Sequence, residues 1–267
     1  MSLFQALVLG IVQGLTEFLP VSSSAHLALI PWAFGWRDPG LAFDVSLHFG
    51  TFIAVLWFFR VEWVRLIRSA IAILATRRLD TPEKRRVVYL VIATIPGAIA
   101  GLALEHYAES YFRSPALIAV VLIVLGVALW LVDKGAPQAR TMDEMTWGQA
   151  LTLGIAQCFA LIPGVSRSGS TITAGRALRF DRESAAVFSF LMSMPIVAGA
   201  ALHEVPKALH QQGLSAAVIV GVLASAISGW LAIAVLLRYV TRHSYGVFAA
   251  YRVILGAAVL ILFFTRG

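Results

Sequence analysis

Residues 10–26, GIVQGLTEFLPVSSSAH, have the pattern of an apolar helix that is broken by a proline and followed by three serines. A proline ends a helix at or before the preceding residue, and a serine after it is a favourable cap for a new helix. The stretch PGVSRSGST at residues 163–171 breaks the chain in the same way. Both breaks lie in apolar segments that also hold polar residues unsuited to hydrocarbon. We therefore predict two re-entrant helix pairs, over about residues 1–35 and 147–178.

The composition of the chain places both segments in a membrane. Of the 267 residues, 59% are hydrophobic and only 13% are charged, and the mean hydropathy is +0.83. This leaves too little polar surface to cover a soluble domain. Apolar runs long enough to cross a bilayer lie at about 41–60, 86–104, 115–133, 184–203, 215–237 and 247–264. The prediction is an all-α, polytopic membrane protein: one domain over residues 1–267, with six transmembrane helices and the two re-entrant pairs.

The net charge of +7 comes from basic residues that gather between the apolar runs. They lack the aromatic interleaving of a nucleic-acid-binding face, so we expect no nucleic-acid partner. Most of them lie between the first two predicted spans: Arg60, Arg65, Arg68, Arg77, Arg78, Lys84, Arg85 and Arg86. By the positive-inside rule this loop is cytoplasmic. The single cysteine, Cys158, excludes a disulfide framework and a cysteine metal site.

Counting crossings from that loop makes the two halves of the chain run in opposite directions through the membrane. The tetrapeptide GIVQ at residues 10–13 recurs as GIAQ at residues 154–157, and each copy leads into a proline and a serine-rich turn. We therefore predict inverted repeats over about residues 1–134 and 147–267. In such folds the broken helices of both repeats meet near the membrane midplane and build the site there.

The first broken segment carries a carboxylate at membrane depth. Gln13 and Glu17 are spaced i, i+4 and share a helix face, where a bare carboxylate costs about 3 kcal/mol. We interpret Glu17 as a group that accepts a proton or holds a divalent cation; the alternative is a glutamate that reaches interfacial water. The serines at 22–24 and His26 follow in the sequence and would lie within one turn of each other on a helix that begins there. The alternatives there are a plain helix cap and a packing histidine.

The second broken segment has the features of an anion cradle. Its glycines allow close backbone approach, its hydroxyls donate hydrogen bonds, and a following helix would aim its N-terminal amides into the turn. The guanidinium of Arg167 matches phosphate oxygens in a bidentate way. The alternative is a cytoplasmic-side arginine, comparable to Arg176 and Arg179.

These arguments define a composite site for a phosphorylated substrate. The predicted catalytic set is Glu17, Ser23, His26 and Arg167. The predicted substrate-binding residues are Gln13, Ser22, Ser24, Gly164, Ser166, Ser168, Gly169 and Thr171, and Glu17 is the candidate metal ligand. We place Asp44 and His48 at the mouth of a pocket and outside the catalytic set.

The stretches 13–26 and 163–169, with HFGT at 48–51, resemble the signature motifs of the undecaprenyl-diphosphate phosphatases of the BacA (UppP) family. The resemblance covers essentially the whole chain. It implies hydrolysis of undecaprenyl diphosphate to the monophosphate carrier used in peptidoglycan synthesis, in a bacterial cytoplasmic (inner) membrane. It also implies bacitracin resistance, because bacitracin competes for the same diphosphate lipid, and a dependence on Mg²⁺ or Ca²⁺.

Carried over by position, the family motifs fall on Gln13, Glu17, Ser23, His26 and the Ser166–Ser168 stretch. Because Gln13 stands where a second glutamate is also found, this helix cannot chelate a metal with two carboxylates. Ser23 is the preferred nucleophile and His26 the acid or base, with His26 as the alternative nucleophile. The crossing count predicts a site that faces the periplasm. A transporter or flippase for polyprenyl phosphate is the rival function, and the sequence leaves a homodimer open.

Overall fold

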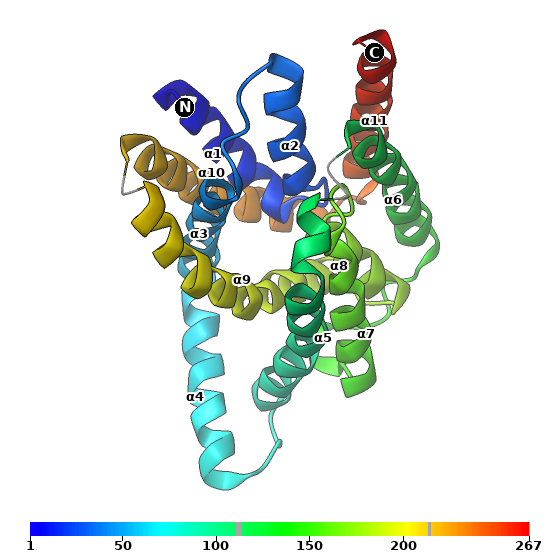
Figure 1. The fold of residues 1–267 in the computed structure, drawn as a ribbon. Coiled ribbons are helices and arrows are strands. Elements are labelled where there is room, and N and C mark those ends of the chain that lie inside the picture. Colours follow the sequence, from blue (N-terminus) through cyan, green and yellow to red (C-terminus); the bar gives the residue numbers. More distant parts are fainter. Residues whose placement is uncertain (111–113, 213–214, 267) are drawn as a thin grey trace.

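The computed structural model describes residues 1–110, 114–212 and 215–266. Its regular elements in these ranges are helical, and Figure 1 shows their arrangement. The eleven α-helices of the described part of the chain are α1 (Leu3–Phe18), α2 (Ser23–Phe34), α3 (Leu41–Phe58), α4 (Arg60–Thr76), α5 (Pro82–Ser110), α6 (Pro115–Gly135), α7 (Trp147–Cys158), α8 (Arg167–Ala177), α9 (Arg182–Gln212), α10 (Ala216–Val240) and α11 (Gly246–Arg266). Two short 3₁₀ helices, η1 (Met142–Glu144) and η2 (Phe159–Leu161), flank α7.

The first predicted break separates α1 from α2. The side chain of Ser2 caps α1 and forms a capping box with Gln5, and the helix ends where Leu19 turns to an extended conformation before Pro20. Helix α2 starts directly after the break and ends at Gly35, which has a left-handed conformation with φ of 66°. With 16 and 12 residues, these helices are about 24 and 18 Å long, shorter than the roughly 30 Å hydrocarbon core.

The second predicted break separates α7 from α8. Thr146 caps α7 and forms a capping box with Gln149, as Ser2 and Gln5 do in α1. The helix tightens into η2 before the turn that leads to α8. Helices α7 and α8 have 12 and 11 residues, so neither can cross a bilayer alone. The two segments that the sequence predicts to be broken are thus both built from short helix pairs.

Within the ranges that the structure describes, five helices are long and apolar enough to cross a membrane: Pro82–Ala103, Pro115–Gly135, Arg182–Leu202, Ala216–Val240 and Gly246–Thr265. A sixth candidate consists of α3 and α4 taken together, which are bent by 80° where they meet. The described part of this polytopic membrane protein therefore has five or six candidate spans, each close to one of the predicted apolar runs.

Helix α4 corrects one expectation, because it occupies most of the segment predicted to be a loop. Its exposed apolar residues recur at helical spacing, as at Val64, Ile67, Ile71 and Leu74, and its arginines occupy other positions. Such an amphipathic pattern stabilises a helix at a membrane surface. Charge counting alone does not distinguish a loop from a helix in this segment.

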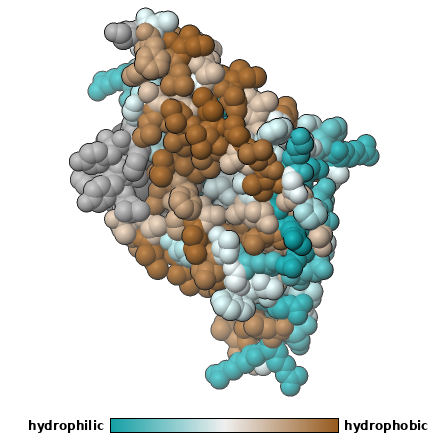
Figure 2. Space-filling model, turned by 90° about the vertical axis from the view of Figure 1, so that its right-hand side faces the viewer, coloured by the Kyte–Doolittle hydropathy of each residue, from teal (hydrophilic) through white to brown (hydrophobic). Residues whose placement is uncertain are grey.

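Helix α9 runs through the middle of the bundle in Figure 1. In its most apolar stretch 56% of the residues are buried, against 17% in that of α5. The outer helices expose large apolar side chains instead, for example Leu102 on α5 at 84% and Ile254 on α11 at 68%. Figure 2 shows a broad hydrophobic face, with hydrophilic residues gathered on one side of it. A surface of this kind is suited to lipid.

Small residues let the first helix of each broken pair pack closely on a long helix. On α1, a Cβ at Gly10 would lie 2.4 Å from the carbonyl oxygen of Gly221 in α10, and one at Gly14 would lie 2.0 Å from Ser228 Oγ. On α7, a Cβ at Gly154 would lie 2.5 Å from the carbonyl oxygen of Ala93 in α5. Both contacts are the small-residue packing of membrane helices.

Candidate active site

The two breaks have the same local geometry. Ser22 and Ser166 are non-glycine residues with positive φ angles of 75° and 71°. Each caps the helix that follows: Ser22 Oγ accepts from the Ala25 amide at 3.4 Å, and Ser166 Oγ accepts from the Gly169 amide at 3.0 Å. A non-glycine residue with such a conformation costs about 1–3 kcal/mol, and residues of this kind cluster at active sites and ligand clamps. The strain marks both turns as candidate functional elements.

A second serine in each turn completes the match and joins the turns to each other. Ser22 and Ser24 hydroxyls are 3.2 Å apart, and Ser166 and Ser168 hydroxyls are 3.1 Å apart. Ser168 Oγ also donates to the carbonyl oxygen of Leu19 at 3.0 Å. This bond crosses from the second break to the first, so the two turns form one structural unit.

Glu17, in the last turn of α1, is the centre of the site. Its carboxylate is buried, and Oε2 accepts from Ser23 Oγ at 2.6 Å and from Gln13 Nε2 at 3.0 Å. Oε1 accepts from Arg167 Nη2 at 2.7 Å. The i, i+4 spacing of Gln13 and Glu17 therefore produces the shared face that the sequence predicts. Both oxygens of one carboxylate connect the two breaks.

Arg167 is the first residue of α8 and extends across to the other half of the chain. Besides the ion pair with Glu17, its Nη1 donates to the carbonyl oxygen of Ser189 on α9 at 3.1 Å. Charge-assisted bonds of this kind are shorter and stronger than neutral ones. Arg167 is therefore paired with a carboxylate in this conformation, and an anionic ligand would compete with Glu17 for its guanidinium.

Burial separates the predicted residues into two groups. Ser23, Ser24 and Arg167 are at least partly accessible, whereas the others named for substrate binding are buried or nearly so: Gln13, Ser22, Gly164, Ser166, Ser168, Gly169 and Thr171. Thr171, for example, is bonded to the Arg167 carbonyl and to Ser189 Oγ, both at 2.7 Å. The first group can meet a ligand directly, while the second holds the turns in place.

His26 lies near the cluster but does not bond to its carboxylate or to Ser23. Its Nδ1 is 2.7 Å from the carbonyl oxygen of Ser22, and its Nε2 is 2.7 Å from the hydroxyl of Tyr251. The rings of His26 and Tyr251 are stacked with centroids 5.7 Å apart. Both nitrogens therefore have partners, which restricts His26 as a nucleophile in this conformation.

A second histidine, which the sequence argument leaves outside the catalytic set, lies closer to the carboxylate. His48 Nε2 is 3.5 Å from Glu17 Oε2, and 32% of its side chain is exposed. Its Nδ1 is held by the carbonyl oxygen of Asp44 at 2.8 Å. The signal was present in the stretch HFGT at residues 48–51, but only the packing of α3 against α1 identifies its partner.

The sequence reasoning also missed Tyr251 and Arg252, two adjacent residues of α11 that contact the residues of the two breaks. Arg252 is 1% exposed and donates to carbonyl groups in both breaks. An available signal was a lone arginine inside the predicted span 247–264, because an ionisable residue at that depth marks a functional region by default.

The cavity beside the cluster is small. It measures about 10 Å³ and lies between Glu17 and Arg167, with Thr51, Ser193 and apolar side chains of α3 and α9 around it. That is room for about one water molecule. A phosphate group therefore requires the walls to move apart or the Arg167–Glu17 ion pair to open.

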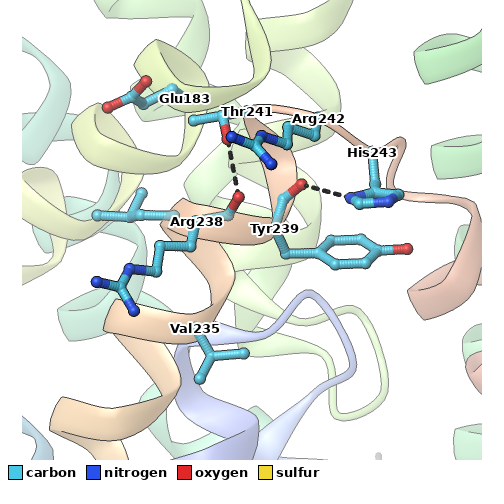
Figure 3. Close-up of a pocket in the computed structure, with 8 residues that line it drawn as sticks. Glu183, Val235, Arg238, Tyr239, Thr241, Arg242 and His243 are labelled. Atoms are coloured by element: carbon cyan, nitrogen blue, oxygen red, sulfur yellow. Dashed lines mark hydrogen bonds between the residues drawn. The ribbon is translucent and has the colours of Figure 1, made fainter.

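A larger cleft, of about 700 Å³, lies elsewhere, at the end of α10. Figure 3 shows its lining, with Arg238, Arg242 and His243 around it. The hydrogen bonds drawn in Figure 3 join residues that are close in the sequence: Thr241 Oγ1 donates to the Arg238 carbonyl at 2.8 Å, and His243 Nδ1 lies 3.2 Å from the Tyr239 carbonyl. None of the predicted site residues lines this cleft, so the volume of a cleft does not identify the candidate active site in this protein.

The residues at the cluster do not fit a protein-held metal ion. Among the side chains that the structure describes, no group of three or more His, Cys, Asp or Glu lies together. Both oxygens of Glu17 already accept hydrogen bonds. A buried oxygen beside it, Gln13 Oε1, has no hydrogen-bond partner. Mg²⁺ and Ca²⁺ take six or more oxygen ligands, so nearly all of them would have to come from phosphate and water.

Comparison with known proteins identifies close relatives. A family model described as "Bacitracin resistance protein BacA" matches residues 6–258. A protein of Gemmatimonas aurantiaca named "Undecaprenyl-diphosphatase" is 58% identical over 266 residues, which is 100% of both chains. A protein of the same name from Pelotomaculum thermopropionicum is 51% identical over 262 residues, 98% of this chain and 97% of the other. A third, from Desulforudis audaxviator, is 45% identical over 267 residues and the full length of both.

Proposed function

The chain belongs to the BacA family, and from this premise we propose that it hydrolyses undecaprenyl diphosphate to undecaprenyl phosphate and inorganic phosphate. The observation that carries the proposal is the position of Glu17 between the Ser23 hydroxyl, at 2.6 Å, and the Arg167 guanidinium, at 2.7 Å. A hydroxyl paired with a base, next to a cation, is what displacement at phosphorus requires.

Ser23 Oγ attacks the terminal phosphorus, and its proton passes to Glu17 Oε2. The bond from that phosphorus to the bridging oxygen breaks, so undecaprenyl phosphate leaves and Ser23 carries the phosphoryl group. Water then attacks the phosphoserine, which releases inorganic phosphate and restores the hydroxyl. His48, 3.5 Å from Glu17 and partly exposed, passes the proton on to solvent.

Arg167 binds the oxygens of the transferred phosphoryl group when the diphosphate displaces Glu17 from it. Positioning and charge stabilisation are the main sources of catalysis in phosphoryl transfer. His26 keeps the first turn in shape through the Ser22 carbonyl, and its two engaged nitrogens favour Ser23 over His26 as the nucleophile. The cluster offers too few free oxygens to hold Mg²⁺ or Ca²⁺ by itself; with Glu17 as its candidate protein ligand, such an ion would supply positive charge against the diphosphate.

We further propose that the halves 1–134 and 147–267 are inverted repeats whose re-entrant pairs meet at this site. The capping boxes that open α1 and α7, and the matching turns at Ser22 and Ser166, support the proposal. The basic residues of α4 and of the following turn support a cytoplasmic position for that end. The site then faces the periplasm of a bacterial inner membrane, where bacitracin competes for the lipid.

The matching turns also favour a second function, the movement of polyprenyl phosphate across the membrane. Purified protein reconstituted in vesicles separates the two functions, because a transporter alone would bind and move the lipid phosphate without releasing inorganic phosphate. Hydrolysis without movement rejects the transport proposal, and movement without hydrolysis rejects the phosphatase proposal.

The test of the nucleophile compares Ser23→Ala with Ser24→Ala. Ser24 is exposed, and its hydroxyl bonds to Ser22 Oγ, whereas the Ser23 hydroxyl bonds to Glu17. Purified variants are incubated with farnesyl diphosphate labelled in its terminal phosphate, then quenched in acid and analysed for phosphoserine. We expect a labelled Ser23 peptide in the wild type and in Ser24→Ala, and no label with only residual turnover in Ser23→Ala. Turnover of Ser23→Ala at the rate of Ser24→Ala would reject Ser23 as the nucleophile.

A further inference from the structure

Arg252 is a buried charge that the proposed chemistry does not use. It lies on α11 within the candidate span Gly246–Thr265, and 1% of it is exposed. Among the described residues, it forms no ion pair with a carboxylate and is bonded only to backbone carbonyl groups. Burying an arginine is costly unless every donor is satisfied. Its retention at this depth therefore requires an explanation.

Four of the five hydrogen bonds of the guanidinium lead to the two breaks. Nη1 donates to the carbonyl oxygens of Pro20 at 3.2 Å and Val165 at 3.1 Å, and Nη2 donates to Gly164 at 2.8 Å and Val165 at 3.1 Å. Nε donates to the Leu122 carbonyl on α6 at 3.2 Å. The planar guanidinium is rigid, so one group sets the distance between the first turn, the second turn and the helix behind them.

The surrounding residues make room for this contact. A Cβ at Gly169 would lie 2.7 Å from Arg252 Nη1, and a Cβ at Gly126 would lie 3.0 Å from Arg252 Cβ. Glycine at these two positions lets α8 and α6 approach the arginine. The neighbouring residue on α11, Tyr251, bonds to His26 Nε2 at 2.7 Å. Two adjacent residues of the last helix thus support the site from behind.

We propose that Arg252 is a positioning residue of the phosphoryl-transfer site. It holds the two turns at the separation at which Ser23 and Arg167 meet on opposite oxygens of Glu17. Its uncompensated positive charge also strengthens the attraction of the site for a diphosphate. The proposal rests on the site assignment made above for Glu17, Ser23 and Arg167.

The first test replaces Arg252 by lysine, which keeps the positive charge but loses the planar guanidinium and its several N–H donors. Its control is Arg176→Lys: Arg176 is also fully buried and bonded to carbonyl groups, and in addition to Asp133, but it lies at the far end of α8. Turnover of farnesyl diphosphate and thermal stability are measured in detergent. We expect Arg252→Lys to lower kcat by about 100-fold with KM changed less than threefold, because misplacement by about 1 Å costs that much. Arg176→Lys loses stability but keeps the kcat of its folded fraction.

The second test separates positioning from a general loss of structure. In the double variant Ser23→Ala with Arg252→Lys, a positioning role predicts no loss beyond that of Ser23→Ala, because both changes disable the same step. Multiplied losses, or a kcat of Arg252→Lys within threefold of wild type, would overturn the proposal. If Ser23→Ala itself turns over normally, the site assignment fails instead.

Gly169→Ala disturbs the same contact while keeping the arginine, and it decides the matter if the lysine variant does not fold. Its added methyl would lie 2.7 Å from Nη1 and must displace the guanidinium. We expect kcat to fall at least tenfold. Unchanged kcat in folded Gly169→Ala would also overturn the proposal.

Discussion

Replacement of Glu17 by glutamine tests the centre of the site with the smallest change of shape. The carboxylate accepts from Ser23, Gln13 and Arg167 at 2.6, 3.0 and 2.7 Å. An amide can still accept from Arg167 through its oxygen, but its NH₂ group then faces the Ser23 hydroxyl and the Gln13 amide. The variant therefore loses the base and keeps the volume.

A general base contributes about 10² to 10⁴ in rate, which corresponds to roughly 3–5 kcal/mol of transition-state stabilisation. We expect kcat of Glu17→Gln to fall by that factor. KM should stay level or fall, because the variant no longer places a negative charge against the diphosphate and leaves Arg167 free to bind it. The assay is release of inorganic phosphate from farnesyl diphosphate by purified protein, with a thermal melt to establish folding.

The control is Gln13→Leu, which removes a neighbour of the carboxylate but not the base; we expect a loss of about tenfold or less, in line with one hydrogen bond of about 1 kcal/mol. The reasoning would be refuted by a folded Glu17→Gln variant with kcat within threefold of wild type. It would also be refuted if the whole loss lay in KM.

Two predictions concern stability. Gly14→Ala places a Cβ 2.0 Å from Ser228 Oγ and should destabilise the protein by about 1–3 kcal/mol. In the control, Gly101→Ala, the added Cβ meets nothing within 4 Å, so this variant should be neutral or slightly stabilising. Equal melting temperatures for the two variants would contradict the packing of α1 on α10. Asp133→Asn removes a carboxylate that is 2% exposed and that accepts from Arg176, Arg182 and the Tyr245 amide. The variant should therefore lose about 3–5 kcal/mol of stability. Asp80 is exposed, so the control variant Asp80→Asn should keep the melting temperature of the wild type.

The membrane character and the two breaks follow from local physics and could be read from the sequence. Composition excludes a soluble fold, and a proline next to serines ends one helix and caps the next. The observed breaks between α1 and α2 and between α7 and α8 lie where the sequence predicts them. The pairing of Gln13 with Glu17 also follows from helical periodicity alone.

The region after Phe58 shows where such reasoning ends. Charge patterning predicts a cytoplasmic loop, but the segment forms helix α4, bent by 80° from α3. Net charge reports which side of a membrane a segment prefers, whereas backbone conformation there depends on how apolar residues face lipid.

What the sequence determined by itself is the inventory: a polytopic membrane protein with two turns that carry hydroxyls, one carboxylate at Glu17 and one arginine at Arg167. What only the tertiary structure decided is which of these groups meet. Arg167 contacts Glu17 across 150 residues of chain, His48 replaces His26 as the histidine nearest to the carboxylate, and Arg252 joins turns far from it in sequence. The physical reason is range: helix ends depend on neighbours within a few residues and membrane character depends on composition, while burial and the assembly of the site depend on long-range packing that periodicity and composition do not encode.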